Sequence, residues 1–391
     1  MSGFIKKKEN IVLAFLLLFS VSIGLWNNFR QLWMQSNNMN VGAIGSVISF
    51  GTLICVVAIL IFSKYINIGK IKSFISSFVL LKIIILITLF FLNKSSSVIL
   101  INVLVITDII LERLIIISIY PLITTIKVSD KLYGKRKLTE YLGRDLGILI
   151  GGIFLGKTIM NIVIDYNVCL IITILFSIVS LIVLLNTTIE KHEIHEIKQN
   201  IFKYIFSNKH RRLYMIYYLI TQISYSAVFG LQILILTHFI KFSDVGATRY
   251  LLVVGILADI IGILCLKYFQ PKNDYLTISI KFGLRAFWYI LAFMTNNMTI
   301  IIIAISWSIL ISTAYENVTD APYVNAVSLD KQLPYANLRY MTKSLGEAIG
   351  VYICTFMFDY GIRYILLVGG LLVIIQLIIG YVLIYQRKCN N

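Results

Sequence analysis

Two pairs of carboxylates stand out in a sequence that is otherwise poor in charge. Asp108 and Glu112 are four residues apart within a long apolar segment, and Glu316 and Asp320 repeat that spacing in a later one. Residues four apart share one face of a helix. Carboxylates at membrane depth face a cavity or a basic partner, so this pattern predicts either a site that exchanges a proton for a cation or a structural ion pair. Arg113, beside Glu112, is the nearest basic residue in the sequence.

The composition places these acids in a membrane. Of 391 residues, 59% are hydrophobic and 14% are charged, which exceeds what soluble cores hold. About 20 apolar residues cross the ~30 Å hydrocarbon layer as a helix. We find twelve such segments: Ile11–Gln35, Val41–Ser63, Ser73–Leu92, Val98–Ile126, Leu142–Ile164, Val168–Thr188, Leu213–Ile240, Val245–Leu266, Tyr275–Phe293, Met298–Ala326, Leu338–Phe358 and Tyr364–Gln386. They are apolar on every face, which predicts an all-α polytopic membrane protein with twelve transmembrane helices.

The net charge of +17 reports topology and not a nucleic-acid partner. With the N-terminus inside, the cytoplasmic segments hold 23 lysines and arginines and the outer segments hold five. This bias in short loops predicts a multi-pass protein of the cell membrane with both termini in the cytoplasm.

The chain divides into two similar halves. A polar stretch, 190–212, predicts a cytoplasmic linker between six-helix bundles at 1–189 and 213–391. Matching residues recur in order at an offset that drifts from 204 (Val41 and Val245, 245 − 41) to 199 (Arg144 and Lys343, 343 − 144). An ordered offset of this kind predicts a parallel repeat, and hence two pseudo-symmetric bundles with a solute site between them.

Two six-helix halves, a cytoplasmic linker and internal termini resemble the major facilitator superfamily of secondary transporters. The segment 64–72 resembles the family's basic loop, although the usual acidic residue and one arginine are missing. The resemblance implies that the first, fourth, seventh and tenth helices line the central cavity. It thereby assigns Asp108, Glu112, Arg113, Glu316 and Asp320 to substrate binding and proton coupling.

Glycines of the fifth segment resemble the glycine motif of proton-driven exporters. They are Gly147, Gly151, Gly152 and Gly156. Gly152 stands where that motif has proline, and Leu155 where it has glycine. Glycines at four-residue spacing also let helices pack closely, whatever the protein does.

Other charges within the predicted helices have gating or structural interpretations. Near the cytoplasmic ends of the fifth and eleventh segments, four charged side chains could close a gate: Arg144, Asp145, Lys343 and Glu347. Lys82 and Arg285 match each other at an offset of 203 (285 − 82), on helices that the resemblance places at the periphery, and we expect them to be structural. Arg30, late in the first segment, is expected to extend to the outer surface.

These features favour a proton-coupled exporter of an amphipathic or cationic small molecule or peptide, which works by alternating access. A nutrient symporter or a lipid flippase of the same fold remains open, as does a membrane-embedded enzyme or receptor. The sequence has no nucleotide-binding loop, metal-ligand cluster or nucleophile with a base. We therefore expect no enzymatic activity, cofactor or metal, and a monomer whose partners are the lipid bilayer, protons and the substrate.

Overall fold

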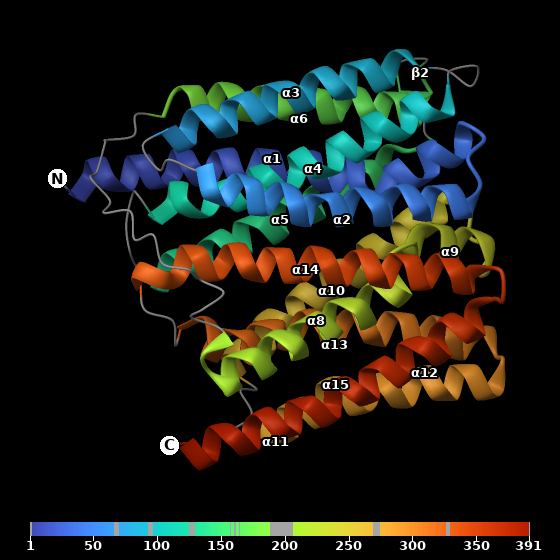
Figure 1. The fold of residues 1–391 in the computed structure, drawn as a ribbon. Helices are drawn as coiled ribbons and strands as arrows, with labels where there is room; N and C mark the ends of the chain where they lie inside the picture. Colours follow the sequence, from blue (N-terminus) through green and yellow to red (C-terminus); the bar gives the residue numbers. More distant parts are fainter. Residues whose placement is uncertain are drawn as a thin grey trace. The chain divides into compact units, whose positions relative to one another are not determined.

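The computed structural model describes residues 2–65, 70–92, 97–124, 130–156, 158–159, 162–163, 165–187, 206–268, 274–325 and 329–390 (Figure 1). Its helices are α1 (Ser2–Ser36), α2 (Val41–Tyr65), α3 (Ile71–Phe91), α4 (Val98–Thr124), α5 (Asp130–Phe154), α6 (Tyr166–Leu185), α8 (Lys209–Phe229), α9 (Gln232–His238), α10 (Asp244–Tyr268), α11 (Asp274–Ile278), the π-helical η2 (Ser279–Gly283), α12 (Leu284–Thr295), α13 (Met298–Asn325), α14 (Leu329–Phe358) and α15 (Ile362–Asn390). Between α5 and α6, strands β1 (Thr158–Ile159) and β2 (Ile162–Val163) pair antiparallel. The prediction of an all-α fold is confirmed, with this two-stranded hairpin as a small addition.

Each of the twelve predicted segments overlaps one described helix or a run of helices. The predicted end of the fifth segment, Ile164, was wrong, because α5 ends at Phe154, before Gly156 with its φ of +75°, and strands β1 and β2 follow. The seventh is divided into α8 and α9, and the ninth consists of α11, η2 and α12. Seven described helices are long and apolar enough to cross a membrane. Helix α4 is not among them, because every 18-residue window of its 27 residues contains Asp108, Glu112 and Arg113. Its charges must therefore be compensated inside the protein.

Two compact units can be distinguished by their internal contacts. The first comprises Met1–Asn40, Phe50–Glu196 and Ser243–Leu252, and the second Val41–Ser49, Ile197–Phe242 and Val253–Asn391. The first turns of α2 are thus packed within the second unit, where Ser49 Oγ donates to Ala348 O at 2.8 Å. Most of the predicted linker, 190–205, lies outside the described residues.

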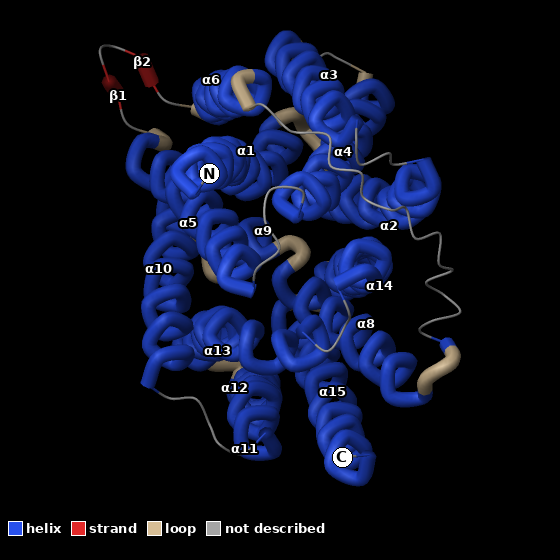
Figure 2. The backbone as a smooth tube through the Cα atoms, turned by 90° about the vertical axis from the view of Figure 1, so that its left-hand side faces the viewer, coloured by secondary structure: helices blue, strands red, loops and turns tan. Residues whose placement is uncertain are grey.

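The two units repeat one packing pattern. In the first, α1 packs against α5 and α6, and α3 packs against α4 and α6; Figure 2 shows α1 end-on beside α5 and α6. In the second, α8 packs against α14 and α15, and α12 packs against α13 and α15. Each helix of the second set is the counterpart of one in the first, in the same chain order. The predicted pair of pseudo-symmetric six-helix bundles is confirmed.

Glycines fix the register of this repeat. A Cβ added at Gly147 of α5 would meet Val21 O and, at 2.6 Å, Leu25 N of α1. One added at Gly346 of α14 would meet Leu219 O at 2.9 Å and Ile223 N at 3.3 Å of α8. The same backbone atoms are met at an offset of 198 (219 − 21 and 223 − 25). Close packing of small residues therefore aligns α1 with α8 to the residue.

Candidate functional site

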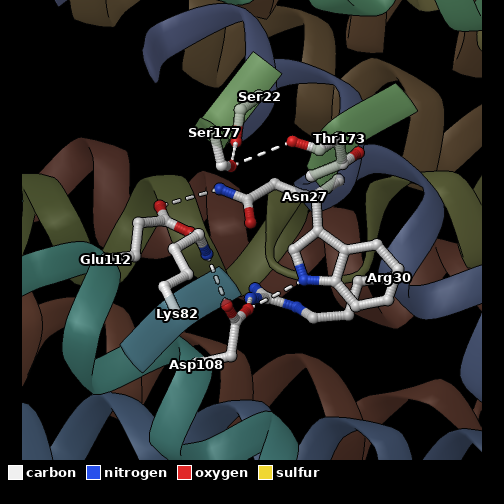
Figure 3. A network of polar contacts seen from close by, with 9 residues as sticks. Ser22, Asn27, Arg30, Lys82, Asp108, Glu112, Thr173 and Ser177 are labelled. Carbon is white, nitrogen blue, oxygen red and sulfur yellow. Dashed lines mark hydrogen bonds and ion pairs between the residues drawn. The ribbon is translucent and has the colours of Figure 1, made fainter. Parts of the chain in front are cut away.

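Three helices of the first unit bring four charged side chains together in its interior (Figure 3). Arg30 belongs to α1, Lys82 to α3, and Asp108 and Glu112 to α4. Lys82 and Asp108 have no exposed surface, and the exposed fractions of Glu112 and Arg30 are 4% and 8%. We call these four residues the buried charge cluster.

Asp108 is the anchor of the buried charge cluster, because both of its oxygens accept from donors. Lys82 Nζ donates to Oδ1 and forms an ion pair with it. Trp26 Nε1 donates to Oδ2 at 2.8 Å, and Arg30 Nη1 donates to the same oxygen at 3.4 Å. Two cations and an indole N–H thus surround one carboxylate and donate charge-assisted hydrogen bonds to it.

Glu112 lies one helical turn further along α4 and is held more loosely. Its Oε1 accepts from Asn27 Nδ2 at 2.9 Å. Its Oε2 is 4.0 Å from Lys82 Nζ and has no hydrogen-bond donor among the described residues. The four-residue spacing therefore puts both acids on one face, as predicted, and Lys82 lies between them (Figure 3).

The charges of this cluster balance, since Arg30 and Lys82 match Asp108 and Glu112. Burying an unmatched charge at membrane depth costs about 2.5–3.5 kcal/mol on insertion scales, and removing one partner of a buried pair is strongly destabilising. Hydroxyl groups lie beside the cluster. Ser22 Oγ and Ser177 Oγ are 2.8 Å apart, and Ser177 Oγ donates to Thr173 O at 2.9 Å (Figure 3). Helices α1 and α6 are thereby joined beside the cluster.

Arg30 departs from its predicted place. Its side chain is buried and donates to Asp108, whereas the sequence analysis expected it to extend to the outer surface. The prediction counted residues along the helix and ignored the direction in which the side chain points. Trp26 and Asn27 were not among the predicted site residues, although a polar run from Asn27 to Gln31 within an apolar helix is a signal for them.

The second unit has a cation at the place that corresponds to Lys82. Arg285 of α12 is 2% exposed, and it donates to Tyr289 Oη at 3.3 Å and to Ser224 O at 3.4 Å. Its guanidinium lies 5.9 Å from the ring centre of Tyr225 and 5.4 Å from that of Tyr289. Tyr289 Oη donates in turn to Ser308 Oγ at 2.6 Å. Lys82 and Arg285 are therefore interior residues of their units.

The second predicted acid pair cannot be placed in this way. Glu316 and Asp320 belong to α13, but their side chains lie outside the described residues. Arg113 is half-buried on α4, next to Glu112.

The predicted gating charges form short-range pairs on their own helices. Arg144 Nη2 is 2.9 Å from Glu140 Oε1 on α5, and Lys343 Nζ is 3.7 Å from Glu347 Oε1 on α14. Asp145, beside Arg144, is half-buried. Both ion pairs have the i, i+4 spacing, but Arg144 is paired with the acid one turn before it and Lys343 with the acid one turn after it. The 199-residue correspondence of Arg144 and Lys343 therefore does not extend to how each is paired.

Three of the four predicted glycines lie on two faces of α5, and Gly156 follows the end of the helix. Gly147 and Gly151 pack on α1, whereas Gly152 is nearest to Thr248 of α10, whose methyl group is 3.5 Å from an added Cβ. Arg249 Nε donates to Gly152 O at 3.1 Å. Gly156 has a φ of +75°, a left-handed conformation that glycine adopts without strain. The described contacts of these glycines are those of closely packed helices.

The described residues contain no group of three or more His, Cys, Asp or Glu side chains that could hold a metal ion.

Solved transporters share this fold. A mutant of the nucleoside transporter NupG and the human organic anion transporter MFSD10 each give a TM-score of 0.69 at 11% identity, covering 96% of this chain and 99% of theirs. The E. coli fucose:proton symporter FucP gives 0.68 at 13% identity, covering 96% and 98%. The sequence matches no protein-family model, and no curated protein matches it in sequence. The chain thus has the fold of major facilitator transporters and is a multi-pass membrane protein.

Proposed function

We propose that this protein is a secondary transporter in which the buried charge cluster couples proton movement to substrate movement. The observation that carries the proposal is Asp108, a fully buried carboxylate that joins α1, α3 and α4 through two cations. A protein that needed only stable helices would do without such a cluster, because replacing buried ion pairs by apolar side chains is often neutral or stabilising. Charges at this depth are a functional-site hypothesis by default.

The proposed mechanism is alternating access of the two bundles, with protonation of an acid and occupation by substrate excluding each other. A proton added to the balanced cluster gives it a net positive charge, which disfavours a cationic substrate and favours its release. We assign the second half of this site to Glu316 and Asp320, on the helix that corresponds to α4. The proposed direction is export, on the glycine pattern of α5, with an amphipathic or cationic small molecule or peptide as substrate.

Inverted membrane vesicles provide the test. An inward proton gradient is followed by acridine orange quenching, and a panel of cationic dyes, peptides, nucleosides and sugars is added one compound at a time. A cation exchanged for protons will restore the fluorescence in vesicles that contain the protein, and not in vesicles that lack it or that carry Glu112→Gln. If none of the panel restores fluorescence or accumulates under the gradient, the proposal of proton-coupled export is wrong.

Uptake that runs down the proton gradient in right-side-out vesicles, for a sugar or a nucleoside, would replace export by symport. The protein would then still be a transporter, but the direction of transport would be uptake and not export.

A further inference from the structure

The two acids of α4 differ in how their oxygens are occupied, and this difference assigns them different roles. We propose that Glu112 is the residue that takes up and releases the coupling proton, and that Asp108 is a permanently ionised counter-ion that positions Lys82 and Arg30. The inference rests on the proposed proton coupling and names the residue that performs it.

Asp108 is poorly placed to accept a proton. Oδ1 already accepts from Lys82, and Oδ2 accepts from Trp26 and Arg30. A proton on Oδ2 would displace a donor, and a proton on either oxygen would leave two buried cations without their common anion. Neither loss could be made up by water, because Asp108 has no exposed surface.

Glu112 can take a proton without losing a described hydrogen bond, and the contact that protonation weakens is its 4.0 Å ion pair with Lys82. Asn27 Nδ2 donates to Oε1, and this hydrogen bond survives protonation, because a carbonyl oxygen also accepts. Oε2, buried and without a donor among the described residues, is the atom that the proton would occupy. The bond formed is Oε2–H, with the proton coming from water on one side of the membrane and returning to water on the other.

Charged groups from each neighbouring helix bear on Glu112. Lys82 of α3 is 4.0 Å away, and Arg144 of α5 interacts with it electrostatically. Arg30 of α1 is engaged by Asp108, and Asp108 and Arg113 lie on α4 itself. The cations attract the carboxylate of Glu112, and Asp108 repels it. Lys82 connects the two acids, since neutralising Glu112 leaves the ammonium group to Asp108 alone.

Infrared difference spectroscopy tests this assignment without a substrate. The purified protein in lipid nanodiscs is taken from mildly alkaline to mildly acidic pH, and the carbonyl stretch of a protonated carboxyl group is recorded. The wild-type band should be lost in Glu112→Gln. It should persist in Glu140→Gln, a matched buried glutamate on α5, and in the charge-balanced double variant Lys82→Met/Asp108→Asn. A band that survives in Glu112→Gln, or that disappears in either control, overturns the proposal, as does a wild-type protein with no titrating band.

A second variant keeps the test decisive should Glu112→Gln fail to fold. Asn27→Ala removes the donor to Oε1, the carbonyl oxygen of protonated Glu112, so the band should move to higher wavenumber; an unmoved band contradicts the assignment. The two proposals also fail separately. A Glu112 band in a protein that moves no compound in the vesicle assay supports proton uptake by Glu112 and rejects the transport proposal, whereas gradient-driven transport retained in Glu112→Gln rejects Glu112 alone.

Discussion

The two units have one architecture and different polar interiors. In the first, Lys82 contacts the carboxylates of Asp108 and Glu112. In the second, Arg285 contacts the hydroxyl group of Tyr289, the rings of Tyr225 and Tyr289, and the backbone carbonyl group of Ser224. The register set by the glycines pairs Trp26 with Ser224 (224 − 26 = 198), and these residues contact Asp108 and Arg285 respectively. The comparison teaches that a duplicated fold can keep a buried cation while its contacts with other described residues change.

The largest expected effect is the loss of the anion in the first unit. Asp108→Asn leaves Lys82 and Arg30 buried with one carboxylate between them, which should cost about 3–5 kcal/mol of folding free energy. The melting temperature in detergent, followed by fluorescence-detected gel filtration, measures it. Asp359→Asn, at an exposed position, is the control and should change stability by no more than about 0.5 kcal/mol.

A charge-balanced variant sharpens the same prediction. Lys82→Met/Asp108→Asn removes one charge of each sign and should be more stable than Asp108→Asn alone. If the double variant melts at or below the single one, electrostatic balance does not explain the cluster.

The next effect concerns the glycines that the two units share. Gly147→Ala and Gly346→Ala should each destabilise the fold by about 1–3 kcal/mol, because the added methyl group meets backbone atoms of α1 or α8, which cannot swing away. Gly283→Ala is the matched control, since an added Cβ there has nothing within 4 Å among the described residues. Thermal melts of the three variants suffice. A Gly346→Ala protein as stable as the wild type, beside a destabilised Gly147→Ala, would contradict equivalent packing in the two units.

The sequence could predict one part of this structure and not another. The length of the apolar segments predicted the helices, and the ordered matches predicted the repeat, because both are properties of residue order along the chain. The shared face of Asp108 and Glu112 followed from their spacing. Their partners did not, because Lys82 is 26 residues away on another helix, and only packing decides which faces meet. Arg30 was misplaced for the same reason: depth along a helix does not tell which way a side chain points.

A smaller effect is expected for the tyrosine of the second unit. Tyr289→Phe removes the hydroxyl group that accepts from Arg285 and donates to Ser308, and should cost about 0.5–1.5 kcal/mol per hydrogen bond. The ring, and with it the cation–π contact of Arg285, is kept. The melting temperature is again the measurement, with Tyr360→Phe at an exposed position as control. A cost as large as that of Asp108→Asn would mean that the second unit depends on its polar interior as strongly as the first.

The smallest effect compares two hydrogen bonds at the same interface of each unit. Ser22 and Ser177 join α1 to α6, and Thr221 and Gln376 join α8 to α15, with Gln376 Nε2 donating to Thr221 Oγ1 at 2.6 Å and Gln376 Oε1 accepting from Ser224 at 3.1 Å. The counterparts Ser177 and Gln376 are 199 residues apart (376 − 177).

Interhelical hydrogen bonds in membrane proteins average about 0.6 kcal/mol. Ser177→Ala should therefore cost about that much and Gln376→Leu about twice as much, because Gln376 makes two such bonds and Ser177 makes one across its interface. Measurement of both in steric-trap or denaturant unfolding resolves differences of this size. Equal costs would show that the additional contact to Ser224 contributes nothing, and a larger cost for Ser177→Ala would tie this serine to the neighbouring charge cluster.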